Sequence, residues 1–300
     1  MKLSERQNCP CGSEKRLVDC CLRDDGSLRP NRWKANLPGE RTELKHSKCY
    51  ASELANCSSQ ISREHFISES VLELAGDDGF IEMRGLAWQP IGERKRLSTS
   101  NLAANVLCKR HNEGLSDIDS VGKDLFERLL YVNKGFSRGD GEGEEAFLFN
   151  GRNVELWMLK TLCGTVASGN TDTEDKSTSD WTPPIEWLEI LFEDKDMPKG
   201  CGMYYLSRVG DRRKLTQSVS FSSLSNPDWG VYGAILILNG HEFVLAMRPP
   251  ESRKNTILED SVYRPLELVM RAGSGKRVVI FGWEMEGDQK TIVLDYQEQV

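Results

Sequence analysis

Two short segments of the chain place histidine beside residue types that bind metals. The segments read ISREHFI and LCKRHNEGL, and they hold two of only four histidines in 300 residues, His65 and His111. A neutral imidazole titrates near neutral pH, so it can act as a base or bind a metal. The oxygens of Glu64 and Asn112 suit hard divalent ions, and the thiolate of Cys108 suits zinc. The two segments therefore predict hydrolytic chemistry, metal binding, or both.

The residues around His65 have the types that phosphodiester hydrolysis requires. That reaction needs a water nucleophile, a base to deprotonate it, and a cation on the scissile phosphate. His65 is the natural base. Glu64 projects to the opposite side of the same strand or turn, from where it could bind Mg2+ or Mn2+. Asp117 and Asp119 could support the site, although a solvated position at a helix start is favoured for both.

The nine cysteines fall largely into two clusters, which in a cytosolic protein indicates metal binding before disulfides. The first cluster has the pattern C-x-C-x8-C-C and places four soft ligands within 13 residues: Cys9, Cys11, Cys20 and Cys21. Four ligands this close can surround one tetrahedral Zn2+.

The segment CPCGSEKRLVDCC resembles the SEC-C zinc motif, with Glu14 where that motif usually has glycine. The resemblance implies a zinc-held knuckle that contacts a protein or a nucleic acid and has no catalytic role. A redox-active thiol group is the alternative, but no thioredoxin-like βαβ pattern surrounds these cysteines.

The second cluster lies within residues 49–116. Cys49 and Cys57 open it, a Glu-His pair follows on a short β-type run, and the stretch NLAANVLCKRHN closes it. This order of Glu-His, Asn-Leu ahead of an apolar pair, and C-x2-H-N resembles the HNH endonucleases, also called ββα-metal nucleases. The sequence departs from the family pattern in three ways. Seven residues separate the first two cysteines, the last zinc ligand is histidine, and about 35 residues separate His65 from Asn101.

The resemblance implies a role for each residue of this cluster. His65 would be the base, and Asn101 would orient it, with Asn105 as the alternative. Glu64 and Asn112 would hold the catalytic Mg2+ or Mn2+. The structural zinc that braces many family members would be held by Cys49, Cys57, Cys108 and His111. His111 could instead bind the catalytic ion, but four ligands suit a closed structural zinc site, so the first assignment is preferred.

The fold class predicted from these patterns is α+β. We expect a ββα-metal nuclease core, an N-terminal zinc knuckle and a C-terminal domain that mixes helices with an antiparallel sheet. The expected boundaries are 1–25 for the knuckle, 26–48 for a linker, 49–135 for the nuclease domain and 150–300 for the C-terminal domain of unknown role.

Apolar periodicity predicts helices over 116–132, 153–169 and 183–194. Residues 77–100 and 137–145 are expected to be irregular. Short β-type runs follow residue 201, and Asn239-Gly240 is the predicted turn of one hairpin. His241, which follows this turn, has no evident partner in the sequence and is interpreted as a structural residue.

The composition excludes several classes of protein. Apolar residues make up 38 % and charged residues 28 % of the chain, as in soluble globular proteins. There is no run of 18 apolar residues, and the start MKLSERQNCPCG lacks the apolar stretch of a secretory signal. We therefore expect a cytoplasmic protein with no membrane partner. A net charge of −7 argues against coating nucleic acid by charge alone, although a mildly basic N-terminal part leaves local contact open.

The expected function is that of a metal-dependent, HNH-type endonuclease acting on DNA, with RNA left open as a substrate. The resemblance alone suggests a setting in bacterial defence against foreign DNA. A protein partner could bind through the knuckle or the C-terminal domain. The rival interpretation is a non-enzymatic zinc adaptor, in which the two zinc sites present surfaces to nucleic acid or protein. The two interpretations differ in whether His65 is needed.

Overall fold

The computed structural model describes residues 9, 15–20, 32–83, 93, 95–138, 142–170, 181–207, 218–284 and 286–296. Within this part of the chain the helices are α1 (Glu69–Ala75), α2 (Lys109–Leu115), α3 (Ile118–Arg138), α4 (Gly151–Ala167) and α5 (Ile185–Phe192). Three short 3-10 turns are η1 (Leu17–Asp19), η2 (Ser52–Leu54) and η3 (Thr99–Leu102).

The strands form two small pairs and two larger sheets. The pairs are antiparallel and join β1 (Ile61–His65) to β4 (Ala103–Cys108) and β2 (Phe80–Met83) to β3 (Lys95–Ser98). The five-stranded sheet is antiparallel, in the order β10 (Ser261–Tyr263), β6 (Gly202–Leu206), β9 (His241–Ala246), β8 (Gly230–Leu238) and β7 (Val219–Asn226). The four-stranded sheet has the order β13 (Thr291–Asp295), β11 (Glu267–Ala272), β12 (Gly275–Gly282) and β5 (Glu144–Asn150).

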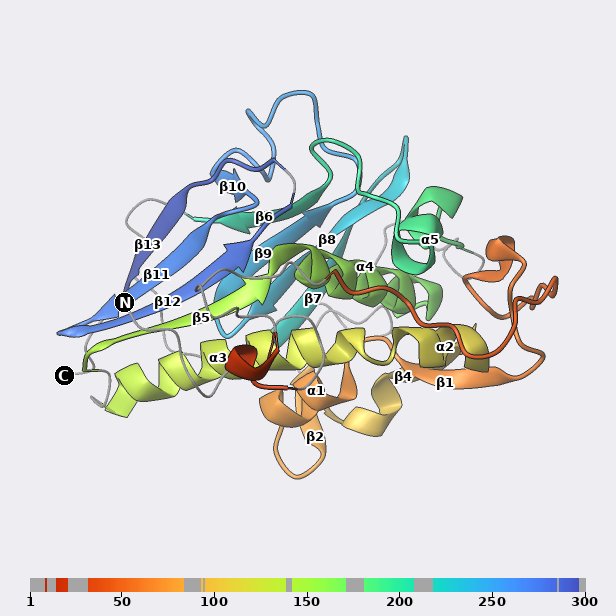
Figure 1. Ribbon diagram of the computed structural model, residues 1–300, viewed down its shortest axis with the longest axis horizontal. Helices are drawn as coiled ribbons and strands as arrows, with labels where there is room; N and C mark the ends of the chain where they lie inside the picture. Colours follow the sequence, from red (N-terminus) through yellow and green to blue (C-terminus); the bar gives the residue numbers. More distant parts are fainter. Residues whose placement is uncertain are drawn as a thin grey trace.

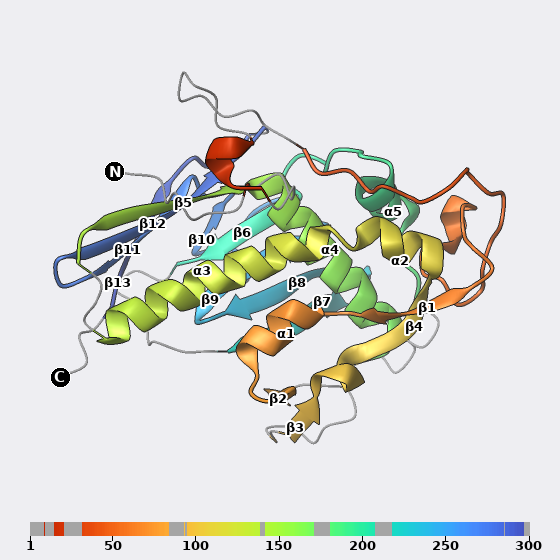
Figure 2. The same ribbon diagram turned by 60° about the horizontal axis from the view of Figure 1, so that its bottom comes forward.

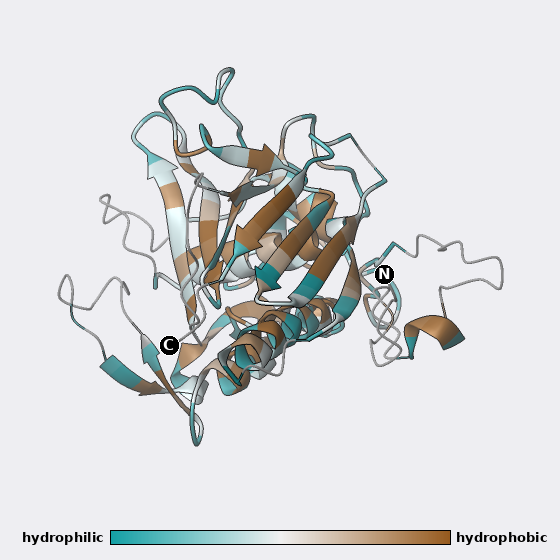
Figure 3. Cartoon of the chain, turned by 90° about the vertical axis from the view of Figure 1, so that its left-hand side faces the viewer, coloured by the Kyte–Doolittle hydropathy of each residue, from teal (hydrophilic) through white to brown (hydrophobic). Residues whose placement is uncertain are grey.

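The two larger sheets lie together at one side of the molecule, and α3 and α4 run beside them (Figure 1). The β1–β4 pair lies at the opposite end of these helices, next to α2 (Figure 2). Apolar residues dominate the strands of the larger sheets, whereas the connecting loops are mostly hydrophilic (Figure 3). The result is a mixed α/β structure in which one continuous core extends from Trp33 to Tyr296.

Helix α4 is the central element of this core. Nearly all its residues are buried, and it contacts α3, α5 and strands of both larger sheets. A helix that is apolar on all sides is stable only when neighbours cover every face. The Asn150 side chain caps its start by accepting a hydrogen bond from the Asn153 backbone N–H at 3.2 Å. Three charged residues of α4, Arg152, Glu155 and Lys160, are buried with the apolar ones.

Several predicted elements are confirmed. The helices expected at 153–169 and 183–194 are α4 and α5, and the helix expected at 116–132 is α3, which extends to Arg138. The hairpin turn is also confirmed, because Leu238 pairs with His241, and Asn239 and Gly240 both have positive φ angles, 51° and 84°. Positive φ at both central residues is what a type I′ turn requires.

Other expectations are corrected by the structure. Residues 77–100 are not wholly irregular, since they contain β2, β3 and the start of η3. The predicted acidic turn at 137–145 is shorter than expected, since α3 ends at Arg138 and β5 starts at Glu144, and residues 139–141 lie outside the described residues. The sheet structure is not antiparallel throughout, because β5 runs parallel to β12 and β13 runs parallel to β11. Pairing between β5 and β12 joins residues more than a hundred positions apart, which local sequence patterns do not reveal.

Among the described residues, no helix combines the length and the apolar character needed to cross a bilayer.

Candidate metal centre and the neighbouring histidine

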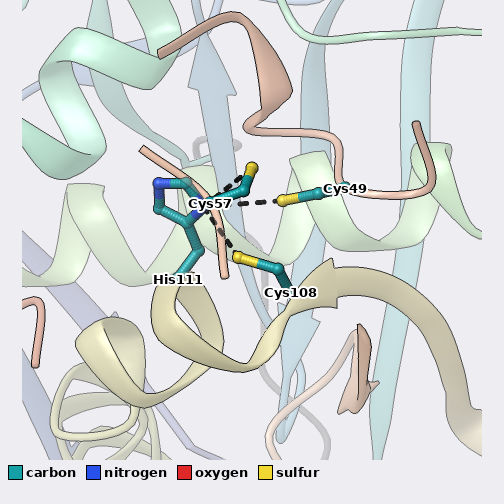
Figure 4. Close-up of side chains that lie close together, drawn as sticks. All are labelled: Cys49, Cys57, Cys108 and His111. Atoms are coloured by element: carbon teal, nitrogen blue, oxygen red, sulfur yellow. Dashed lines mark hydrogen bonds between the residues drawn. The ribbon is translucent and has the colours of Figure 1, made fainter. Parts of the chain in front are cut away.

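Four buried side chains of the second cysteine cluster converge on one point (Figure 4). The three sulfurs and a histidine nitrogen all lie within 4.8 Å of one another: Cys49, Cys57, Cys108 and His111. His111 Nδ1 lies 3.5 Å from the Cys49 sulfur, 3.8 Å from that of Cys57 and 3.2 Å from that of Cys108. In tetrahedral zinc, Zn–S and Zn–N bond lengths place sulfur and nitrogen about 3.5 Å apart. These four residues could therefore hold a metal ion such as zinc.

Each ligand is positioned by local backbone structure. Cys49 and Cys57 lie on either side of η2, and Ala55 reverses the chain with a left-handed φ of 48°. This turn accounts for the long spacing between the two cysteines. A hydrogen bond from Tyr50 N–H to the Val106 carbonyl (2.9 Å) ties the turn to β4. Cys108 ends β4, and α2 begins at the next residue, so that His111 lies in its first turn.

Hydrogen bonding within the cluster favours a thiolate at Cys108. A bond from the Cys49 thiol, together with one from His111, lowers the pKa of Cys108, while the same contact and burial raise the pKa of Cys49. The Ser58 backbone N–H also donates to the Cys108 sulfur at 3.3 Å. A divalent cation would stabilise the thiolate form of all three cysteines. The chemistry of the donor set thus fits zinc.

Phe192 of α5 closes the cluster from the other side. Its ring meets the His111 ring edge-on, with centroids 4.8 Å apart and an interplanar angle of 63°. Such contacts restrict the orientation of an imidazole ring. The contact thus helps to hold the His111 ring with Nδ1 toward the cysteines. In this way α5 supports the predicted zinc centre.

His65 lies at the opposite end of the β1–β4 pair from the cysteine cluster. In the register of this pair Ile61 faces Cys108, whereas His65 faces Ala103. The His65 side chain is 22 % exposed, and its Nε2 lies 3.7 Å from the Glu69 carboxylate. Nε2 is itself buried and makes no hydrogen bond to the described residues. No side chain of the described residues therefore holds this nitrogen, and water would have to reach it for His65 to act as the predicted base.

Glu64 points into the core instead. Its Oε1 lies 2.6 Å from Nζ of Lys160, and that nitrogen lies 2.5 Å from Oδ2 of Asp119. Burial raises the pKa of Glu64, and the Lys160 ammonium opposes this rise. The role of Glu64 as a ligand of a catalytic ion stays a prediction. With its carboxylate against Lys160, Glu64 does not fit that role in this arrangement.

The three asparagines considered as partners of His65 lie on three different elements: α2, η3 and β4. Asn112 on α2 faces β1, where its Nδ2 donates to Ser62 Oγ at 2.8 Å. Asn101 is exposed on η3, and no hydrogen bond among the described residues joins it to His65. Asn105 is exposed on β4. The structure thus brings Asn112 to the strand that bears His65, whereas the roles assigned to Asn101 and Asn105 stay predictions.

The N-terminal cysteine cluster is described only in part. Cys9 is buried and Cys20 partly buried, while Cys11 and Cys21 lie outside the described residues. Cys9 and Leu17 pack on Leu148 of β5. The first zinc site therefore stays a prediction.

The sequence pattern did not identify Lys160, because a single lysine in a mainly apolar helix does not reveal its partners. Asp119 lies at the helix start predicted for it and stays partly exposed, with a side-chain exposure of 28 %, but it also has partners that the sequence did not reveal. Asp119 contacts Lys160 and accepts a hydrogen bond from Ser68 Oγ at 2.5 Å, because α3 packs against α1 and α4. His241 gains two partners that the sequence did not reveal. Its Nδ1 lies 2.9 Å from the Tyr205 hydroxyl, and its Nε2 lies 2.8 Å from that of Tyr296.

Comparison with known proteins finds no matching family model, no matching curated protein and no matching solved structure. The resemblances to HNH endonucleases and to the SEC-C motif therefore rest on the residues alone.

Proposed function

We propose that this chain is an endonuclease that hydrolyses phosphodiester bonds in DNA, with His65 as the base. One observation carries the proposal: the cysteine and histidine ligands bring the η2 loop, the end of β4 and α2 together at one end of the β1–β4 pair, and His65 lies at the other end of the same pair. A rigid support that holds a reactive side chain at its edge is what catalysis requires.

The chemistry assigned to the protein residues centres on His65. Its Nε2 would take a proton from a water molecule that enters the site, and the water oxygen would attack the phosphorus atom. The bond from phosphorus to the leaving ester oxygen would break, and that oxygen would take up a proton from solvent. The Glu69 carboxylate, at 3.7 Å, would stabilise the imidazolium that forms. The zinc would hold the strands and helix in register and would take no part in the reaction. No step is assigned to the divalent ion of the resemblance, because Glu64 is held by Lys160.

The test is the nicking of supercoiled plasmid DNA by the purified chain with Mg2+ or Mn2+. Two matched variants are compared. His65→Ala removes the proposed base from β1, and His46→Ala removes a histidine from the turn that precedes Cys49. We expect His65→Ala to lose nicking by about 10²-fold or more, the range of general-base effects. His46→Ala should retain nicking, and both variants should retain zinc. Wild-type protein that never cleaves DNA with any divalent ion, or equal cleavage by His65→Ala, contradicts the proposal.

The contact between Glu64 and Lys160 favours a second candidate function, that of a non-enzymatic zinc adaptor. A carboxylate held by a buried ammonium is unavailable to bind a catalytic ion, and the strand pair would then serve only as a scaffold. An adaptor should bind DNA or a protein with the same affinity in wild-type and His65→Ala forms. Gel-shift titration of both forms, alongside the nicking assay, separates the two functions.

A further inference from the structure

A second functional side chain shares the outer face of β1 with His65. Successive side chains of a strand point to opposite faces, so residues two positions apart share a face. The pairing of β1 with β4 shifts register between Ser62 and Glu64, yet burial still alternates along this end of the strand. Arg63 is exposed, Glu64 is buried and His65 is partly exposed. A guanidinium group therefore stands on the same side of the strand as the proposed base.

The Arg63 guanidinium is held toward the His65 end of the β1–β4 pair. Its Nη2 donates a hydrogen bond to the carbonyl oxygen of Ser100 at 2.5 Å. Ser100 lies on η3, and this turn leads directly into Ala103, the residue that faces His65 across the strand pair. The backbone thus fixes the direction of the long Arg63 side chain, and this direction is toward the imidazole.

The positive charge of Arg63 is not balanced by a carboxylate within the described part of the chain. The hydrogen bond to Ser100 is made to a neutral carbonyl and uses one of five N–H donors of the guanidinium. Other arginines are held by acidic side chains: Arg32 by Asp194, Arg253 by Asp288 and Arg264 by Glu155. An exposed guanidinium with donors to spare can bind two oxygens of one phosphate, which is the geometry that arginine forms best.

The proposed hydrolysis needs a cation on the face of His65. Negative charge develops on the phosphate oxygens in the transition state, and a fixed positive group stabilises it. The resemblance assigns this task to a divalent ion at Glu64. That carboxylate lies on the opposite face of β1, with Oε1 at 2.6 Å from the buried Lys160 ammonium, and so does not fit the assignment. Arg63 has the required charge on the required face.

We propose that Arg63 binds the phosphate of the scissile bond and supplies the positive charge that the resemblance assigns to a divalent ion. This inference rests on the proposed function, because it names the residue that meets the substrate beside His65. Arg63 donates two hydrogen bonds to the non-bridging oxygens while His65 takes a proton from the attacking water. The bond from phosphorus to the leaving oxygen breaks, and that oxygen takes up a proton from solvent. Cleavage then requires neither Mg2+ nor Mn2+.

The first test is the nicking of supercoiled plasmid DNA in buffer freed of divalent ions by a chelating resin, with and without added MgCl2. Zinc content is followed by mass spectrometry in the same samples. We expect wild type to nick equally in both buffers and Arg63→Gln to lose about 10²-fold or more. Arg63→Lys keeps the charge but not the paired donors and should lose about 10-fold. The control Arg271→Gln removes an exposed arginine from β11 and should match wild type.

Two outcomes of this test overturn the inference and leave the proposed function standing. One is nicking by wild type that disappears without MgCl2 and returns when it is added. The other is nicking by Arg63→Gln at the wild-type rate. Urea denaturation establishes whether Arg63→Gln is folded, and if it is not, Arg63→Lys decides the matter by the same comparison.

The second test reads the phosphate contact without cleavage. Binding of a short DNA duplex is measured against KCl concentration in the His65→Ala background. Each phosphate contact contributes about 1 to the slope of log K against log salt, so Arg63→Gln should lower the slope by about 1. Arg63→Lys and Arg271→Gln should leave it unchanged. A lowered slope in a protein that never nicks DNA contradicts the endonuclease and keeps Arg63 as a phosphate-binding residue. Equal slopes for Arg63→Gln and Arg271→Gln, or no binding of DNA, overturn the inference.

Discussion

The two ends of the β1–β4 pair differ in almost every physical property. At the Cys108 end four soft ligands are buried, lie at distances that suit one tetrahedral metal, and are covered by Phe192. At the His65 end the groups are hard oxygens and an ammonium, the imidazole is partly exposed, and the charges do not cancel. A metal site whose ligands are all protein side chains stabilises the fold. A partly exposed group of titratable side chains whose charges do not cancel is more typical of a reactive site. We therefore expect substitutions at the Cys108 end to affect mainly the free energy of unfolding, and substitution of His65 to affect mainly the proposed cleavage of DNA.

The largest effect on stability is expected from Cys108→Ser. A structural zinc site contributes about 10–16 kcal/mol of apparent binding free energy in small zinc domains, so loss of one ligand should cost several kcal/mol in the free energy of unfolding. Zinc content by mass spectrometry and urea denaturation measure the change. Cys163→Ala, which removes a buried cysteine from α4, is the control and should keep its zinc. A Cys108→Ser protein with wild-type zinc and stability would show that the cluster binds no structural metal.

The next largest loss of stability is expected from Lys160→Met, at the His65 end of the β1–β4 pair. Removing one partner of a buried ion pair leaves an uncompensated charge and typically costs about 3–5 kcal/mol. Urea denaturation measures this loss, and adding Glu64→Gln to Lys160→Met should restore part of it. A loss below about 1 kcal/mol, the range of exposed ion pairs, would mean that the cluster is solvated in solution.

A smaller loss of stability is expected from Asn112→Ala. This change removes the hydrogen bond to Ser62, and a hydrogen bond of this kind contributes about 0.5–1.5 kcal/mol. The zinc content should stay at the wild-type value, while His111→Ala should lose zinc. If Asn112→Ala lost zinc and His111→Ala kept it, then Asn112 and not His111 would be the zinc ligand.

The smallest effect on stability is expected from His65→Ala. The side chain is partly exposed and has only the distant contact to Glu69, so the free energy of unfolding should change by about 0.5 kcal/mol or less. Thermal and urea denaturation test this value in the same samples used for plasmid nicking. A loss of several kcal/mol would indicate that His65 is a structural residue and would remove the contrast between the two ends.

The sequence predicted the cysteine cluster because its chemistry is local and specific. Clustered cysteine and histidine are typical of metal binding, and C-x2-H places one ligand at the N-cap and the other in the first turn of α2. The partners of Glu64 could not be predicted in the same way. Lys160 lies in a helix whose pattern indicates only burial, and its contact with Glu64 exists because α4 packs against α3 and brings Lys160 next to the end of β1. The parallel pair of β5 and β12 was missed for the same reason, since strand patterns show burial but not the choice of partner.

The complete burial of α4 sets an order of events during protein synthesis. The helix is covered on one side by α3 and on the other by strands that the ribosome makes last, including β12 at residues 275–282. A nascent chain that ends before β12 therefore leaves a mainly apolar helix exposed to solvent and to chaperones. Lys160 can take its place against Glu64 only after this helix has docked. The His65 end of the molecule is thus assembled only when translation is nearly complete, and a truncated chain would expose the buried faces of α4 without forming this end.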